Sequence, residues 1–140
     1  MSELWPTWRL SWLESIFEFA SANMQEKLWK GDAVGVQSSF DECICGYFDD
    51  LDLGKGYEAF VRDGMVSRQE ADILLKFHDL ADHYEPPNQV SDSAVFSDPQ
   101  WAKVTAEAQR AWLSLKAVIT SEKELARMGQ LEAQWGSFSE

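Results

Sequence analysis

Residues 40–87 read FDECICGYFDDLDLGKGYEAFVRDGMVSRQEADILLKFHDLADHYEPP. This stretch holds two runs of helical periodicity, a turn-rich link between them and a surplus of acidic residues. Residues 32–98 contain fifteen Asp or Glu and four Lys or Arg, so they carry −11 of the formal net charge of −12. Residues 1–31 sum to −1, and residues 99–140 sum to zero. The charge is regional, and the sequence predicts a small helical protein with an acidic middle.

The length and composition predict one domain with its own hydrophobic core. A chain of 140 residues has the size of a single domain, and at this length roughly 68% of the unfolded surface is buried on folding. Hydrophobic residues make up 45% of the chain and include seven Trp and eight Phe. We therefore expect one helical domain over residues 1–140, with an aromatic-rich core. Residues 129–140 are expected to form a frayed tail, with docking through Leu131 and Trp135 as the alternative.

The negative charge restricts the partners that this chain can bind. Phosphate groups would be repelled, so we expect neither nucleic acid nor an anionic membrane surface, and a basic protein is favoured. The N-terminus lacks the basic start and apolar run of a signal peptide, and no stretch approaches the roughly 18 apolar residues of a membrane span. Cys43 and Cys45 are too close in sequence for an ordinary structural disulfide. We expect a cytoplasmic protein with reduced thiols.

Apolar spacing predicts a first amphipathic helix from Ser11 to near Gly31. Ser11 and Glu14 have the spacing of a capping box, although Pro6 allows an earlier start. The apolar stripe, with members three or four residues apart, consists of Leu10, Leu13, Ile16, Phe17, Ala20, Met24 and Leu28. A second helix is expected over residues 36–51.

A further long helix is predicted over residues 67–84. Ser67 and Glu70 form a clear capping box, and Pro86 closes the helix at its other end. Because its apolar set is broad, we expect this helix at the centre of the bundle. That set is Ile73, Leu74, Leu75, Phe77, Leu80, Ala81 and Tyr84. A short helix over residues 57–61 is expected to precede it.

The C-terminal third predicts one more long helix. Residues 88–97 are expected to form a polar loop, after which Asp98 and Pro99 are a typical N-cap and first helical residue. The stripe that follows is Trp101, Val104, Ala108, Ala111, Trp112, Leu115, Val118 and Ile119. It loses phase after Thr120, where Ser121 predicts a restart or kink. No alternating run predicts a strand, so the expected fold is all-α: a single-domain helical bundle of four long helices plus one or two short ones.

The polar side of the predicted second helix is acidic. Like charges on one helix face destabilise it by a few tenths of a kcal/mol per pair, and they bring no structural benefit. The face is either a solvated surface that favours solubility or a docking surface for a basic protein, where complementary charge sets association rate and specificity. The candidate partner-binding residues are Asp41, Glu42, Asp49, Asp50, Asp52, Tyr57, Asp79, Asp82 and Glu85. The candidate aromatic anchors are Tyr47, Tyr57 and Trp29.

No metal-binding or catalytic pattern is complete. A calcium loop starting at Asp50 would need an acid or amide fifth, Gly sixth and Glu twelfth. Those positions hold Gly54, Lys55 and Val61. His78 and His83 are five residues apart, whereas helical zinc ligands stand four apart, and a helix pair of His78 with Asp82 is favoured. Cys43 lies on the apolar side of its helix and is expected to be a buried, inert thiol. We expect no enzymatic activity, no metal and no cofactor.

Three segments follow one another in a recognisable order: GYFDDLDL at 46–53, VSRQEADILLKFHDLADHYEPP at 66–87 and SDPQWAKVTAEAQRAW at 97–112. In this order they resemble small bacterial immunity proteins, such as those paired with contact-dependent growth inhibition toxins. The resemblance implies a cytosolic, non-enzymatic protein that binds its cognate toxin domain, often a basic nuclease, and neutralises the active site. It supplies no residue-by-residue site, so the candidate residues rest on charge alone.

Two functional hypotheses therefore remain open, with a weaker third. The first is an immunity protein whose acidic residues meet Lys and Arg of a toxin domain. The alternative is a regulatory or adaptor bundle that acts through an exposed Trp and Phe surface or as a homodimer. The third is an enzyme that uses His78 and nearby acids.

Overall fold

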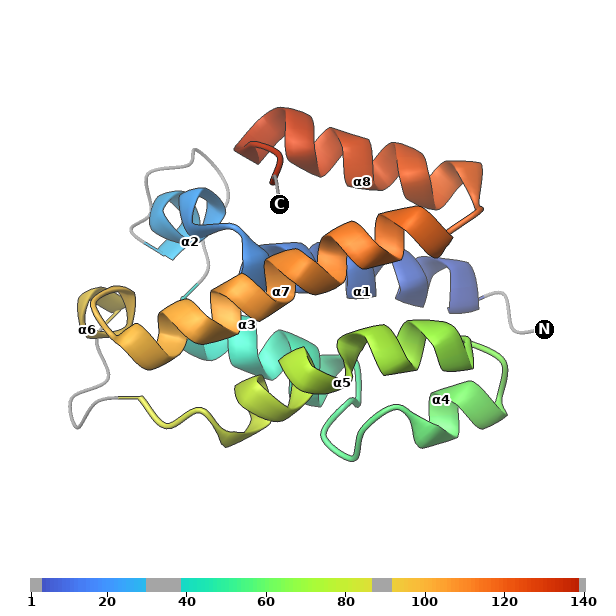
Figure 1. Cartoon of the computed structure of the whole chain (residues 1–140), viewed down its shortest axis with the longest axis horizontal. Coiled ribbons are helices and arrows are strands. Elements are labelled where there is room, and N and C mark those ends of the chain that lie inside the picture. The colour runs from blue at the N-terminus through green and yellow to red at the C-terminus, as the bar shows by residue number, and fades with distance from the viewer. Residues whose placement is uncertain (1–3, 30–38, 87–91, 139–140) are drawn as a thin grey trace.

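Every regular element that the structure describes is a helix. The computed structural model describes residues 4–29, 39–86 and 92–138. The elements are α1 (Leu4–Ala20), α2 (Ala22–Trp29), α3 (Phe40–Cys45), the π-helix η1 (Gly46–Asp50), α4 (Glu58–Arg62), α5 (Arg68–His83), α6 (Asp92–Phe96), α7 (Pro99–Val118) and α8 (Glu122–Trp135) (Figure 1). The all-α bundle is confirmed. Its four long helices are α1, α5, α7 and α8, and the short ones are more numerous than expected.

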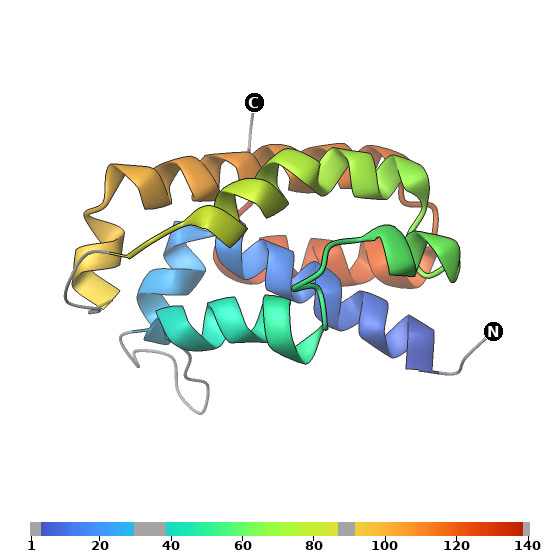
Figure 2. The same ribbon diagram turned by 90° about the horizontal axis from the view of Figure 1, so that it is seen from below.

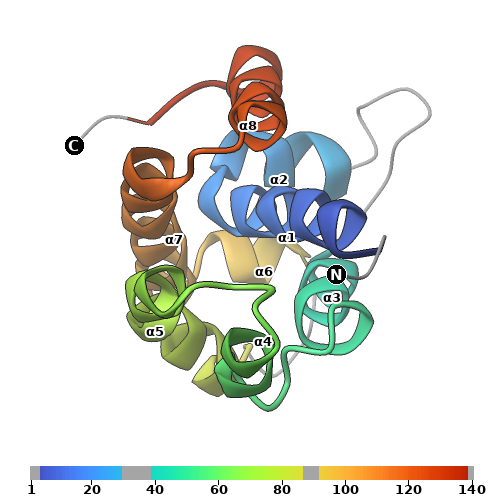
Figure 3. The same cartoon turned by 90° about the vertical axis from the view of Figure 1, so that its right-hand side faces the viewer.

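Helix α1 lies at the centre of the bundle. It contacts α7, α8, α3 and η1, and two perpendicular views place it between α7 and α3 (Figures 2 and 3). Its fully buried side chains are Trp12, Leu13, Ile16, Phe17, Phe19 and Ala20. The helix is apolar on several sides because neighbours cover several sides. The central place expected for residues 67–84 therefore belongs to α1, whereas α5 leaves Leu75 59% exposed.

The starts of three long helices are confirmed. Ser67 and Glu70 exchange two hydrogen bonds, of 2.9 and 3.0 Å, between their side chains and main-chain amides, which completes the capping box of α5. Asp98 caps α7 from the residue before Pro99, and Ser121 caps α8. Local capping chemistry therefore sets these boundaries.

The predicted first helix is in fact two helices. Helix α1 begins before Ser11, as the alternative start allowed, and ends at residue 20. The Ser21 hydroxyl accepts a hydrogen bond of 3.0 Å from the Met24 amide and so caps α2. The buried Gln25 side chain donates to two main-chain carbonyls at the end of α1, at 2.7 and 2.9 Å. These bonds replace those that a continuous helix would have made.

The predicted second helix is a short α-helix that continues as a π-helix. Residues 36–38 lie outside the described ranges, and α3 begins after Ser39, whose hydroxyl accepts from the Glu42 amide at 3.0 Å. Further along, the Leu51 amide donates to the carbonyl of Gly46 at 3.2 Å, the wider spacing of a π-helix. Asp52 then takes a φ of 61°, a conformation that Asp tolerates better than most residues.

Two predictions of irregular structure are wrong. Helix α6 occupies part of the expected loop at 88–97, because Val95 is fully buried and anchors it. Helix α8 continues to Trp135 through the expected frayed tail, because Leu131 is 1% exposed. Residues 88–91 of the predicted loop and residues 139–140 of the predicted tail lie outside the described ranges.

Candidate functional site

Five of the predicted acidic residues lie together on α3, η1 and the turn that follows. All are exposed, and none forms an ion pair with a Lys or Arg that the structure describes; we call them the acidic face: Asp41, Glu42, Asp49, Asp50 and Asp52. Residues 40–52 contain no Lys or Arg, so this segment has a charge of −5. The mutual repulsion of these carboxylates is not relieved by a neighbouring cation within the described ranges.

Six carboxylates on other helices are ion-paired, in contrast, although the exposed acids Asp72, Asp79 and Asp82 of α5 have no described ion pair. Their cations come mostly from a different helix, such as Arg9 of α1, which binds two of them, and Lys116 of α7. The carboxylates held in this way are Glu14, Glu58, Glu70, Glu107, Glu124 and Glu132. The acidic face is therefore a region of uncompensated charge and not simply a sample of the chain's composition.

A groove of about 490 Å³ separates the acidic face from α1. Glu42 and Asp50 line it from one side, and Glu14 and Glu18 line it from α1. Trp8 adds an apolar wall and is fixed there, because its indole N–H donates to a main-chain carbonyl next to η1 at 3.2 Å. An apolar wall beside carboxylates suits a Lys or Arg side chain, which has an apolar stem and a charged end.

The predicted aromatic anchors are wrong. Tyr47, Tyr57 and Trp29 are 0%, 6% and 7% exposed, so none can reach a partner. They belong to the apolar arcs of their segments, and packing against α1 and its neighbours covers them. Among the side chains whose exposure is described, the large exposed apolar ones are Leu75 and Leu125, and none is a Trp or Phe. The exposed aromatic surface that the adaptor hypothesis needs is not present in those residues.

The buried tyrosines instead form a chain of hydrogen bonds beneath the acidic region. The indole N–H of Trp12 donates to the Tyr57 hydroxyl at 2.9 Å. The two tyrosine hydroxyls are 2.6 Å apart, and the Tyr47 hydroxyl lies 2.9 Å from Nδ1 of His78. The chain joins α1, η1 and α5 and was not predicted, because it depends on residues up to 45 positions apart in sequence.

We assign the direction of this chain from its donors. Burial raises the pKa of both Tyr47 and Tyr57, so both hydroxyls keep their protons. Since the indole can only donate, the Tyr57 hydroxyl accepts a hydrogen bond from Trp12 and donates one to the Tyr47 hydroxyl. The Tyr47 hydroxyl in turn donates to Nδ1 of His78. His78 therefore carries its ring proton on Nε2. Burial lowers the pKa of His78, with Asp82 and Asp79 opposing the shift, which favours the neutral ring.

The remaining predicted acids, Asp79, Asp82 and Glu85, are also exposed. Asp79 and Asp82 line a pocket on α5 together with His78, while Glu85 lines a separate one. No hydrogen bond of His78 with Asp82 is described: the ring binds Tyr47 through Nδ1, and Asp82 acts on it only through its charge. The nine candidate residues are therefore divided among the acidic face, the α5 face, the region of Glu85 and, for Tyr57, the core.

Both cysteines lie near the acidic face and neither is activated. Cys43 is 3% exposed, and burial, reinforced by Glu18, raises the pKa of its thiol. The prediction that this thiol is buried is confirmed. Cys45 is exposed, and a hydrogen bond with Asp49 raises its pKa. A thiol whose pKa is raised is a poor nucleophile and a poor metal ligand.

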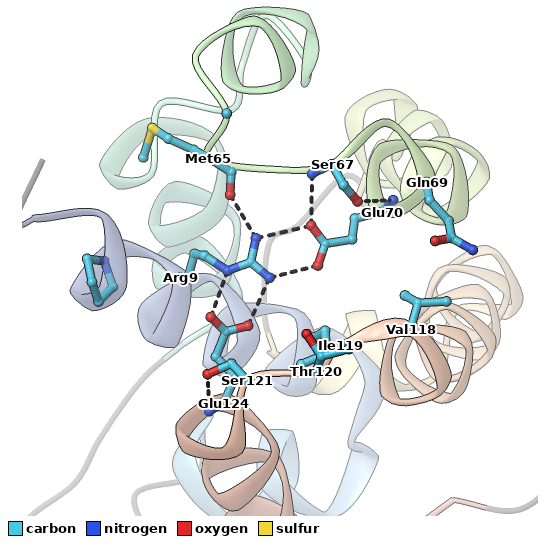
Figure 4. A pocket seen from close by; sticks show the side chains of 12 residues that line it. Arg9, Met65, Ser67, Gln69, Glu70, Val118, Ile119, Thr120, Ser121 and Glu124 are labelled. Carbon is cyan, nitrogen blue, oxygen red and sulfur yellow. Dashed lines mark hydrogen bonds and ion pairs between the residues drawn. The ribbon is translucent and has the colours of Figure 1, made fainter. Parts of the chain in front are cut away.

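A cluster around Arg9 was missed in the sequence and is the most tightly bound polar site of the described residues. Figure 4 shows the guanidinium between Glu70 of α5 and Glu124 of α8. Its N–H groups make five hydrogen bonds of 2.7 to 3.1 Å, four to these carboxylates and one to the Met65 carbonyl. Burial would raise the pKa of Glu70, but Arg9 and Ser67 outweigh it and lower the pKa.

The pocket beside this cluster measures about 540 Å³. Because every guanidinium donor of Arg9 is already used, the cluster acts as a clamp between α1, α5 and α8 and not as a ligand-binding group. The sequence signal was weak: a lone Arg on an apolar helix, whose two partners lie 61 and 115 positions away.

The described ranges contain neither a metal-binding cluster nor a membrane-spanning helix. No group of three or more His, Cys, Asp or Glu is placed there to hold a metal ion. None of the helices described is both long enough and apolar enough to cross a membrane.

Comparison with family models, with curated proteins and with solved structures finds no match to this chain.

Proposed function

We propose that this protein is an immunity-type inhibitor, which binds a basic protein toxin domain through the acidic face and blocks its active site. The observation that carries the proposal is the set of five exposed carboxylates on α3, η1 and the turn that follows, without a described cationic partner. Solubility needs net charge but not its concentration in one segment. A bound protein with Lys and Arg would supply the missing cations.

The shape of the acidic face supports binding without rearrangement. Its carboxylates stand mostly on helical backbone that packs on α1 through buried Tyr47, whose ring meets that of Phe19. Little further ordering of this backbone is therefore needed when a partner binds. The groove next to α1 adds a concave site for one basic side chain. Clustered negative charge also steers a basic partner and accelerates encounter.

The mechanism follows from the chemistry of nucleases. An enzyme that cleaves nucleic acid holds its phosphates with Lys and Arg. A rigid row of carboxylates competes for those cations, and the helical bundle behind it occludes the cleft. The inhibitor performs no reaction in this account.

The direct test is growth rescue in a bacterial host. The probe is the C-terminal domain of the protein encoded by the neighbouring reading frame, expressed with and without this chain. We expect toxicity from the domain alone and rescue by the wild-type chain. Asp49→Lys combined with Asp50→Lys reverses the acidic face on exposed helical positions and should abolish rescue. Asp52 is left unchanged, because its φ of 61° would strain a lysine.

The matched control is Asp63→Lys combined with Glu122→Lys, which has the same charge change at exposed positions away from α3 and η1. It should rescue as well as the wild type. Rescue by the reversed acidic face, or a neighbouring domain without toxicity, would contradict the proposal. Light scattering over a dilution series separates the alternative, since an adaptor that works as a homodimer would dissociate on dilution.

A further inference from the structure

A second acidic pocket, of about 540 Å³, lies between α5 and the segment that leads into α4. One face of α5 lines this pocket at positions i, i+3, i+4 and i+7: Leu75, His78, Asp79 and Asp82. Its ionic groups are Glu58, Asp72, Asp79 and Asp82 with Lys55 and Arg68, so four carboxylates and two cations leave a net charge of −2. Arg68 is hydrogen-bonded to Glu58 at 2.7 and 2.9 Å and also acts on Asp72 through its charge, but no described ion pair joins it to Asp79 or Asp82.

The imidazole of His78 presents one unused donor to this pocket. The residue is only 7% exposed, and its Nδ1 is bound to Tyr47. No described group binds Nε2. Every buried side-chain nitrogen of the described residues has a partner, so Nε2 must be accessible from outside the core. Nε2 is therefore the atom through which the ring reaches the pocket. Since the hydrogen-bond chain places the ring proton on Nε2, a group that enters the pocket meets an N–H donor.

Leu75 gives the same pocket an apolar side. It is 59% exposed, the larger exposure of the two exposed large apolar side chains described. It lies one helical turn before His78 and Asp79. The pocket thus offers an apolar surface, a hydrogen-bond donor and a pair of carboxylates along about two turns of α5.

We propose that this pocket receives a loop of the partner protein that carries a Lys or Arg. The loop's main-chain carbonyl accepts the hydrogen bond from Nε2 of His78, its cation lies against Asp79 and Asp82, and an apolar neighbour covers Leu75. This inference rests on the proposed function and adds a second contact, on α5, to the acidic face. A phosphate or carboxylate ligand fits poorly, because the net negative charge would repel it.

The test is an NMR titration of the labelled full-length chain with a capped Gly-Leu-Lys-Gly peptide at low salt. The control peptide has norleucine in place of the lysine, which keeps the apolar stem and removes the charge. We expect the lysine peptide to cause saturable chemical-shift changes of the His78 ring nitrogens and of α5 amides, and the norleucine peptide to cause none. Asp79→Asn combined with Asp82→Asn should weaken binding about tenfold, and the matched pair Asp41→Asn with Asp49→Asn less than about twofold.

The outcomes separate the two proposals. Saturable shifts confined to α3 and η1 would overturn the pocket and leave the acidic face intact. Equal binding of the norleucine peptide would overturn the need for a cation. Ring shifts that place the His78 proton on Nδ1 would overturn the donor role of Nε2. The absence of saturable shifts anywhere would overturn the pocket, and the rescue experiment would then decide the proposed function alone.

Discussion

The molecule uses its carboxylates in two opposite ways. Around Arg9, the side chains of Glu70 and Glu124 are 8% and 12% exposed and share one guanidinium. On the acidic face, Asp49 and Asp50 are exposed and have no described cation. The first arrangement costs desolvation and is stable only while every partner is present. The second adds repulsion between like charges and leaves its charge available to another molecule. Similar residue types thus hold the fold in one region and, in our proposal, bind a partner in the other.

The largest expected effect comes from removing the cation of the Arg9 cluster. Arg9→Met keeps the apolar stem but leaves Glu70 and Glu124 without their counter-ion, so the free energy of unfolding should fall by about 3–5 kcal/mol. Urea denaturation measures it. The control is Arg127→Met, which breaks an ion pair with Glu14. The side chains of Arg127 and Glu14 are 32% and 48% exposed, so the free energy of unfolding should fall by no more than about 1 kcal/mol. Equal losses in both variants would contradict the distinction.

The next effect concerns the buried hydrogen-bond chain. Tyr47→Phe removes its middle member, so that Tyr57 loses its acceptor and Nδ1 of His78 loses its donor. The free energy of unfolding should fall by about 1–3 kcal/mol. Tyr84→Phe, which removes one hydroxyl bonded to Asp98 at the part-buried edge, should cost less. Thermal unfolding of the two variants ranks them, and a costlier Tyr84→Phe would contradict the account.

A smaller effect is a dependence of stability on pH. Burial lowers the pKa of His78 in the folded state, against the opposing charges of Asp82 and Asp79. The unfolded chain therefore takes up the proton first, and stability should fall as the pH drops from about 6.5 toward the lowered folded pKa. The Glu70 contribution, whose pKa is also lowered, is present above about pH 4.5 and is lost as the pH falls through its folded value.

These two pH windows can be separated by substitution. His78→Asn keeps an acceptor for Tyr47 and removes the titrating ring, so the loss of stability just below pH 6.5 should disappear. The loss at lower pH should remain. Denaturant midpoints across the pH range give both slopes, and an unchanged slope in the His78→Asn variant would contradict the assignment.

The smallest expected effect is a gain in stability. Neutralising two members of the acidic face with Asp49→Asn and Asp50→Asn relieves repulsion that no described cation offsets, so the free energy of unfolding should rise by a few tenths of a kcal/mol. Glu14→Gln, which removes a paired carboxylate, should leave it unchanged or lower it slightly. Chemical denaturation of both variants against the wild type measures the sign. A destabilised Asp49/Asp50 variant would mean that these carboxylates support the fold.

Features encoded within a few residues could be predicted from the sequence. The caps at Ser67, Asp98 and Ser121 each depend on neighbours two or three positions away, and the amphipathic stripes identified an all-α bundle. The break at Ser21 was missed, because Ser21 and Gln25 cap two helices there through bonds that the apolar stripe conceals. The burial of Val95 and Leu131 depends on tertiary packing and could not be read from local polarity.

The candidate site divides in the same manner. The exposure of the acidic residues followed from their helical phase, whereas Tyr57 was assigned to the surface because a short segment gives little periodic information. The clamp at Arg9 and the chain from Trp12 to His78 join residues that are 10 to 115 positions apart. No local pattern predicts such contacts, since folding alone brings their partners together.

The central claim is that the acidic face binds a basic protein. Calorimetric titration of the neighbouring-frame toxin domain into the wild-type chain and into the Asp49→Lys, Asp50→Lys variant, at about 50 and 200 mM salt, tests it most directly. The account predicts tight binding by the wild type that weakens with salt, and a loss of about a hundredfold or more in the variant. An affinity and a salt dependence that are the same in both proteins would contradict it.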